Sequence, residues 1–207
     1  MTNATNTSKL QRKKTTLICG LCAAMLAVGG LMAYFVDYQE VINKFTLSDN
    51  GLEIEVVEPS WVEPDEVLPG DTQAKDPTIK NTNGSIKAWA VAEVAIPMGT
   101  IDGQTVELFT ISGLDTANWT QIGTATVENG CMVYTYGHNA AVDAGKSTSA
   151  LFQSVTLKQM TQTEFEAVSA AHNGMLEISV TGYGIQFDNT DFANVTAAWT
   201  DYSSNQQ

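Results

Sequence analysis

Residues 86–96 read IKAWAVAEVAI, a long run of side chains that suits a β-strand. Only Lys87 and Glu93 are charged, and the rest are alanine, valine, isoleucine or tryptophan. Valine, isoleucine and tryptophan are enriched in strands. Pro97 follows, and because proline has no backbone N–H to donate, we expect the strand to stop there.

The residues after this run continue the β pattern. Asp102-Gly103 is a turn signal, and 106–111 is the next β-compatible stretch, so the two stretches resemble a hairpin. Asn129-Gly130 marks a second tight turn. Further strands are expected over 121–127, 131–136, 149–157 and 175–187.

The residues before the run also predict a strand and a loop. Leu52, Ile54 and Val56 alternate with glutamates, which is the period-two pattern of a half-buried strand. Prolines at 59, 64 and 69 then force a loop. Strands of this length, separated by Gly, Asn and Asp turns, predict a mostly β domain built as an antiparallel sandwich.

Two short helices interrupt the strands. Either Thr161 or Thr163 is expected to cap a helix that ends before Gly174. Residues 191–202 carry Phe192, Val195 and Trp199 at helical spacing, and core packing is the simplest role for these side chains.

The N-terminus has the composition of an export signal. Four basic residues lie between positions 9 and 14, and residues 15–36 carry no charge. Gly29-Gly30 and the small Ala33 favour signal-peptide cleavage between Ala33 and Tyr34. The uncharged stretch is also long enough to span a bilayer, so an uncleaved anchor is the alternative. We expect contact with the membrane only through this leader.

The charge distribution narrows the classes of partner. All 23 acidic residues lie from Asp37 onward with six lysines, which gives this part a net charge of −17. Such a domain repels nucleic acid and anionic lipid, so a nucleic-acid partner is excluded. Cys19 and Cys22 fall in the apolar leader, and Cys131 alone remains for the domain, where we expect a buried, inert thiol within a strand.

Motifs that carry chemistry are missing from the sequence. His138 and His172 form no HExxH pattern, no GxSxG elbow occurs, and no phosphate-binding glycine loop follows a strand. No catalytic residue and no cofactor are therefore predicted. Six acidic residues are interpreted as a solvated acidic loop in preference to a calcium site: Glu58, Glu63, Asp65, Glu66, Asp71 and Asp76.

Several segments together resemble the TasA/camelysin family. The leader junction is similar to those cut by the specialised signal peptidase SipW of Gram-positive bacteria. Leu68-Pro69-Gly70-Asp71, with the Lys75-Asp76-Pro77 and Lys80-Asn81-Thr82 that follow, resembles a family motif. Residues 144–157 and 184–199 resemble the family's later segments.

The resemblance implies a jelly-roll β-sandwich and, for TasA, a subunit of biofilm fibres. In such fibres the N-terminal segment of one subunit completes a sheet of the next by β-augmentation. The donor here would be 34–47, with Phe35, Val41, Phe45 and Leu47 as its apolar side chains. A short helix over 37–44 is the alternative structure for this segment.

The sequence thus predicts a signal peptide or anchor over 1–33, a donor segment over 34–50 and a jelly-roll domain over 51–207. We expect a secreted biofilm-matrix or cell-surface protein that assembles with itself or with related matrix subunits. Two alternatives stay open. One is a camelysin-like metalloendopeptidase, for which the sequence identifies no metal ligands. The other is an anchored surface adhesin that does not polymerise.

Overall fold

A computed structural model describes residues 34–35, 52–64, 66–82, 84–188 and 190–205. The expected leader, including Ala33, lies outside the described residues, and so do Val41, Phe45 and Leu47. No helix among the described residues is long and apolar enough to cross a membrane.

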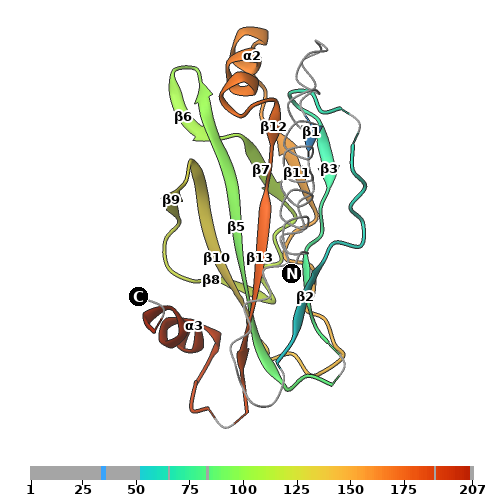
Figure 1. The fold of residues 1–207 in the computed structure, drawn as a ribbon, viewed down its shortest axis with the longest axis vertical. Coiled ribbons are helices and arrows are strands. Elements are labelled where there is room, and N and C mark those ends of the chain that lie inside the picture. The colour runs from blue at the N-terminus through green and yellow to red at the C-terminus, as the bar shows by residue number, and fades with distance from the viewer. Residues whose placement is uncertain (1–33, 36–51, 65, 83, 189, 206–207) are drawn as a thin grey trace, which may run out of the picture. The chain divides into compact units, whose positions relative to one another are not determined.

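The run at 86–96 forms the central strand of the larger sheet (Figure 1). This strand, β5 (Ala88–Ile101), pairs antiparallel with β13 (Ser179–Gln186) on one side and with β10 (Cys131–His138) on the other. Two short strands, β8 (Trp119–Gln121) and β9 (Thr126–Glu128), pair with the far side of β10.

Pro97 does not end β5, so that prediction is wrong. The pairing with β13 finishes at Ala95, and beyond it β5 turns to a new partner, β6 (Gln104–Glu107). Pro97 lies at this change of partner, where its carbonyl accepts a hydrogen bond from Leu108 N–H. The missing N–H is tolerated because the pairing with β13 has already finished at Ala95 and the regular pairing with β6 begins only at Met98. The turn at Asp102-Gly103 closes the predicted hairpin, with φ of 51° and 73°.

A second layer of strands faces the inner side of this sheet. It contains β3 (Thr72–Ala74), β11 (Ser154–Leu157) and β7 (Phe109–Ser112), in the order β3-β11-β7, and the pair β2 (Ile54–Val57) with β4 (Thr78–Asn81). An isolated bridge joins Lys80 to Ser147, and β11 pairs with β3. The chain before and within β11 therefore runs antiparallel to both β4 and β3.

The main core fills the space between the two layers. Alternate residues of β5 point into it, as the sequence alternation requires. Its fully buried members from both layers include Val94, Ile79, Phe109, Phe152, Val155 and Leu157.

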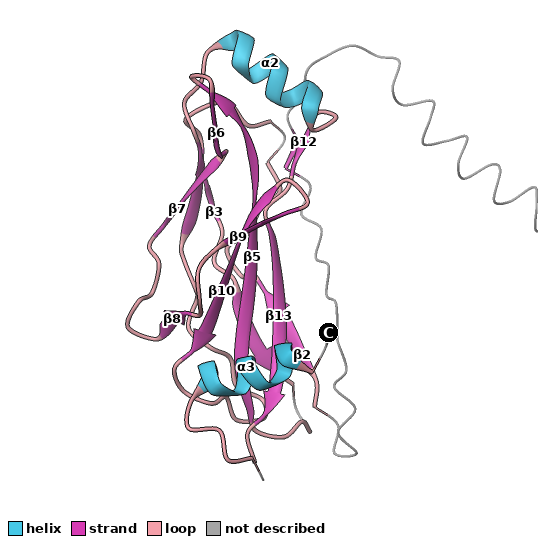
Figure 2. Ribbon diagram, turned by 90° about the vertical axis from the view of Figure 1, so that its left-hand side faces the viewer, coloured by secondary structure: helices cyan, strands magenta, loops and turns pink. Residues whose placement is uncertain are grey.

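α2 (Gln162–Ala171) lies at the end of the domain beside β6 and β12 (Met175–Leu176), and α3 (Val195–Ser204) lies across the larger sheet (Figure 2). α2 is capped by Thr161, which decides between the two predicted caps, and it buries Phe165 and Val168. α3 begins later than predicted because Asn194 caps it. α3 lies across the outer face, close to Gly137, where an added Cβ would lie only 2.6 Å from a methyl group of Val195. The packing role predicted for Phe192, Val195 and Trp199 is confirmed, since all three belong to or pack against one apolar cluster.

Four other strand predictions need correction. Residues 106–111 are divided at Leu108 between β6 and β7, which belong to different sheets. Residues 122–125 belong to neither strand, so 121–127 is two short strands instead of one. Strand 149–157 is paired regularly only from Ser154, and 175–187 is divided into β12 (Met175–Leu176) and β13. Cys131 begins β10 and is half-buried, and burial raises the pKa of its thiol. The fold is mostly β and antiparallel, as predicted, and the jelly-roll topology stays a prediction.

Candidate functional site

The edge formed by β12 and β13 is the first candidate site. β13 is the last strand of its sheet in the order β13-β5-β10-β8, so its outer side faces away from β5. Just before it, β1 (Tyr34–Phe35) pairs in parallel with β12, with Tyr34 opposite Met175 and Phe35 opposite Leu176. Two predicted site residues therefore reach this edge.

The inner side of this edge is apolar and tightly backed. Leu176 and Ile178 are 4% and 7% exposed and face the core. Farther along β13, the side chains of β2 pack onto the strand, and a Cβ added at Gly182 would lie 2.7 Å from Val56 Cγ2. Glycine is needed here because β2 approaches so closely. The edge strand is thus held in place from its inner side by the packing of β2.

The family motif at 68–71 forms a turn. Gly70 has a φ of 95°, which a glycine after a proline provides readily. The Asp71 carboxylate accepts a 2.8 Å hydrogen bond from Leu68 N–H, and Gly70 N–H donates to Leu157 O at 2.8 Å. The motif therefore fixes the start of β3 against the end of β11, and a structural role accounts for its residues.

A buried ion pair overturns part of the solvated-loop prediction. Glu58 and Lys75 meet at 2.8 Å, and both side chains are 5% exposed. The Lys75 ammonium also lies 4.8 Å from the centre of the Trp61 ring, within range of a cation–π interaction. Asp76, from the same predicted cluster, accepts hydrogen bonds from Ser60 N–H at 2.8 Å and Ser60 O–H at 2.7 Å. These carboxylates are occupied by the protein because the loop folds back onto β3.

Two tyrosine–carboxylate pairs connect strands of the larger sheet. Tyr134 O–H donates to Glu107, and Tyr183 O–H donates to Glu93. The Glu107 carboxylate raises the pKa of Tyr134 to about 12, and burial raises the pKa of Tyr183 further. No sequence pattern predicted either pair, because the partners lie 27 and 90 residues apart.

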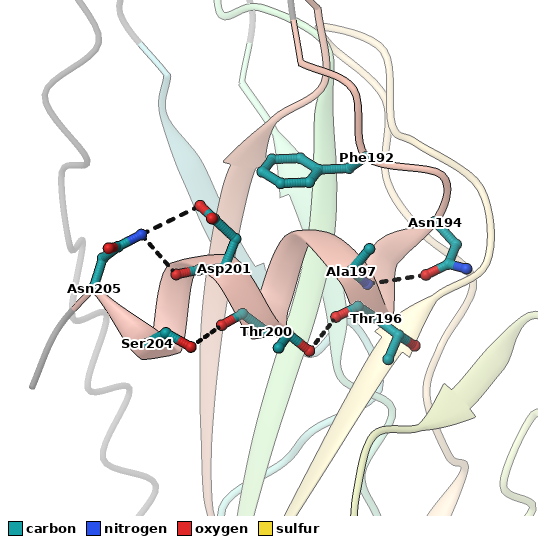
Figure 3. A pocket seen from close by; sticks show the side chains of 8 residues that line it. All are labelled: Phe192, Asn194, Thr196, Ala197, Thr200, Asp201, Ser204 and Asn205. Carbon is teal, nitrogen blue, oxygen red and sulfur yellow. Dashed lines mark hydrogen bonds between the residues drawn. The ribbon is translucent and has the colours of Figure 1, made fainter.

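A shallow hollow lies along the outer face of α3 (Figure 3). Phe192 and Asn194 border one end of it, and Asp201 and Asn205 the other. The Asn205 amide donates to Asp201, and Thr200 and Ser204 donate to helix carbonyls, so much of the polar lining is engaged within the helix. The hollow gives no catalytic arrangement.

The two histidines lie far apart. His138 ends β10, stacks edge-on against Trp119 and contacts Ala140 O through Nδ1. His172 caps the end of α2, and its Nε2 contacts Met98 O. Gly137 is paired with Val91, and the seven residues from there to Met98 span roughly 23 Å of strand. One metal ion cannot bind both imidazoles.

A comparison with known protein families identifies the family to which the chain belongs. The described residues define a mostly β domain of two antiparallel layers, with β13 as the last strand of the larger sheet. A family model described as "Camelysin metallo-endopeptidase" matches residues 9–207, and the chain belongs to this family, the TasA/camelysin family. No curated protein and no solved structure matches it.

The family description implies a metal centre, which the described residues do not fit. Among them, no group of three or more His, Cys, Asp or Glu side chains is placed to hold a metal ion. The histidine separation gives the physical reason, since a catalytic zinc site requires three protein ligands around one point. No reaction step through a metal is derived for this chain.

Proposed function

We propose that this protein is a structural subunit of an extracellular matrix or cell surface, and that its copies join by β-strand addition. The donor would be segment 34–47 and the acceptor the β12–β13 edge of the next subunit. The parallel pairing of β1 with β12 carries this proposal. This pairing supports the β12–β13 edge as the acceptor of segment 34–47, because the first residues of the segment already pair with β12.

The register of that pairing makes the proposal specific. A donated strand that kept the offset of Phe35 on Leu176 would bring Val41 opposite Gly182 and Phe45 opposite Gln186. All four predicted apolar donor residues have odd numbers, so they would share one face of such a strand. In this register that face is the one on which Leu176 and Ile178 point into the core.

Electron microscopy of purified protein tests the donor. The chain that begins at Tyr34 should form fibres, and the chain that begins at Asn50 should not. Within the longer chain, Val41→Asp should prevent fibre formation, because a charge would enter the apolar face. The matched variant Ile42→Asp carries the same charge on the opposite face and should still assemble. Equal polymerisation of the two chain lengths, or of the two variants, would contradict the proposal.

Whether the leader is removed or retained distinguishes a fibre subunit from an anchored adhesin. Family membership supports an extracellular or surface location. A free donor requires removal of the leader, with Tyr34 at the new N-terminus. The mass of the exported protein determines this directly: retention of 1–33 would favour the adhesin.

The family description is the observation that favours a second candidate, a metalloendopeptidase. Casein cleavage by the purified chain, abolished by a chelator and by His138→Ala or His172→Ala, would support it. Cleavage that persists in both histidine variants would indicate a contaminating protease or ligands other than these histidines.

A further inference from the structure

The sequence contains four Asn-Gly pairs, at 50–51, 83–84, 129–130 and 173–174. An asparagine before glycine is chemically labile, because glycine has no Cβ to hinder its backbone nitrogen from reaching the asparagine side chain. The pairs at 129–130 and 173–174 are fully described, and the fold holds them in very different ways.

Asn129 and Gly130 form the two-residue turn between β9 and β10 (Figure 1), with φ of 49° and 78°. Both residues are exposed. In the described part of the chain, neither the Asn129 side chain nor the Gly130 N–H has a hydrogen-bond partner. β9 is three residues long and exposed throughout, so it is a weakly held part of the sheet that opens readily.

Asn173 and Gly174 end helix α2 and are held by the backbone. Gly174 N–H donates to Ser169 O at 2.7 Å, and Asn173 N–H donates to Ala170 O at 3.4 Å. Ser169 is only 5% exposed. This arrangement is a helix C-cap in which the glycine nitrogen is engaged and directed at the helix. The nitrogen that would attack the Asn173 side chain is therefore unavailable until the cap opens.

We propose that Asn129 is a site of spontaneous deamidation in the folded protein and that Asn173 is protected by the cap of α2. The Gly130 nitrogen gives its proton to hydroxide, which becomes water, and attacks Cγ of Asn129. A C–N bond forms and the bond from Cγ to the side-chain nitrogen breaks. The leaving nitrogen takes a proton from water and departs as ammonia, which regenerates the hydroxide. Water then opens the five-membered imide at either carbonyl, which leaves an aspartyl or an isoaspartyl residue at position 129.

The product changes the β9–β10 hairpin. Each event adds a negative charge beside Glu128, in a domain that is already strongly acidic. The isoaspartyl form also lengthens the backbone of a two-residue turn, which can then no longer keep the pairing of Glu128 with Cys131. Gly130 O accepts a hydrogen bond from Met98 N–H at 3.0 Å, so the disturbance reaches β5. The half-buried Cys131 thiol should become more reactive in the modified protein.

Timed incubation of the full chain at mildly alkaline pH, followed by peptide mapping, tests the proposal. Deamidation adds about 1 Da to the peptide that carries the site. In the folded protein, Asn129 should react at least about tenfold faster than Asn173, because one site opens locally and the other must lose its cap. In urea the two rates should become equal, since glycine follows both asparagines. Equal rates in the folded chain, or a difference that persists unchanged in urea, would overturn the proposal.

Two glycine variants provide a second measurement. Asn129→Gly keeps a turn sequence that suits this hairpin and removes the reactive amide. It should lower the early release of ammonia and abolish the rise in Cys131 alkylation during incubation, whereas Asn173→Gly should leave both unchanged. A rise in Cys131 alkylation that is the same in Asn129→Gly and wild type would contradict the proposed consequence for the hairpin.

Discussion

Lys75 Nζ lies 2.8 Å from a carboxylate oxygen of Glu58, and this pair connects the loop after β2 to the end of β3 where water hardly reaches it. Breaking a buried ion pair from one side leaves the other charge without compensation. The pair therefore helps to hold the loop that carries the family motif against the end of β3.

Removal of one partner should be costly. We expect Glu58→Gln, or Lys75→Met, to lower the free energy of unfolding by about 3 kcal/mol, as measured by urea unfolding followed by circular dichroism. The exposed pair of Lys80 with Glu55, at 3.3 Å, is the matched control, and Glu55→Gln should cost less than about 1 kcal/mol. Replacing both buried partners, as in Glu58→Leu with Lys75→Met, should restore most of the loss. A double variant as unstable as the sum of the two single variants would contradict this account.

The cap of α2 gives a prediction with a control two residues away. Thr161 O–H bonds to Glu164, Glu164 N–H donates back to the Thr161 oxygen, and a Glu164 oxygen also accepts from Asp102 N–H at 2.7 Å. Thr161→Ala should lower the free energy of unfolding by about 1 kcal/mol. Thr163→Ala, inside the helix, should change it by less than about 0.5 kcal/mol, because alanine suits a helix interior. Thermal unfolding of both variants under one condition makes the comparison, and equal losses would be inconsistent with Thr161 as the cap.

Local signals explain which parts of the fold the sequence predicted. The Asp102-Gly103 turn, the Thr161 cap and the alternation of Leu52, Ile54 and Val56 each depend on residues a few positions apart, and each is confirmed. β3 and β4 were missed because Thr72 to Asn81 is largely polar and contains Pro77. The strand character of β3 comes from pairing with β11, far later in the chain, and that of β4 comes from pairing with β2, which precedes it across the proline-containing loop. Pro97 was wrongly expected to end the strand, because the change of partner along β5 from β13 to β6 leaves no signal in the neighbouring sequence.

In the candidate site, too, the sequence predicted the features that depend on local signals and not those that depend on distant partners. Phe35 was named from its apolar character, but its partner Leu176 is known only from tertiary pairing. Glu58 was placed in an acidic loop because glutamate is usually exposed, and the buried cation opposite it is 17 residues away.

The Tyr134–Glu107 hydrogen bond predicts how stability depends on alkaline pH. The carboxylate raises the pKa of Tyr134 from 10.0 to about 12, so the folded state favours the neutral phenol. A raised pKa contributes stability below pH 10, and that contribution is lost as the pH rises from about 10 to about 12. The melting temperature should therefore fall over this interval, and less steeply in Tyr134→Phe. Ultraviolet titration of tyrosinate gives the complementary measurement, since the variant should lose a late-titrating group. A variant with an unchanged slope would show that Tyr134 does not contribute.

The close approach of β2 to β13 predicts a coupled pair of substitutions. A Cβ at Gly182 would lie 2.7 Å from Val56 Cγ2, closer than two carbon atoms can pack, so Gly182→Ala forces β2 away from the edge strand. We expect a loss of about 1 to 3 kcal/mol in the free energy of unfolding, the usual cost of overpacking a core. Val56→Ala removes the methyl groups in the way and leaves a cavity by itself, so it should also destabilise the protein. Together the two changes should compensate, and the double variant should be more stable than the sum of the single losses predicts, by at least about 0.5 kcal/mol.

Additive losses would mean that β2 moves aside without strain. In that case the edge strand would not be held by β2, and the β12–β13 edge would be a poorer acceptor for an added strand.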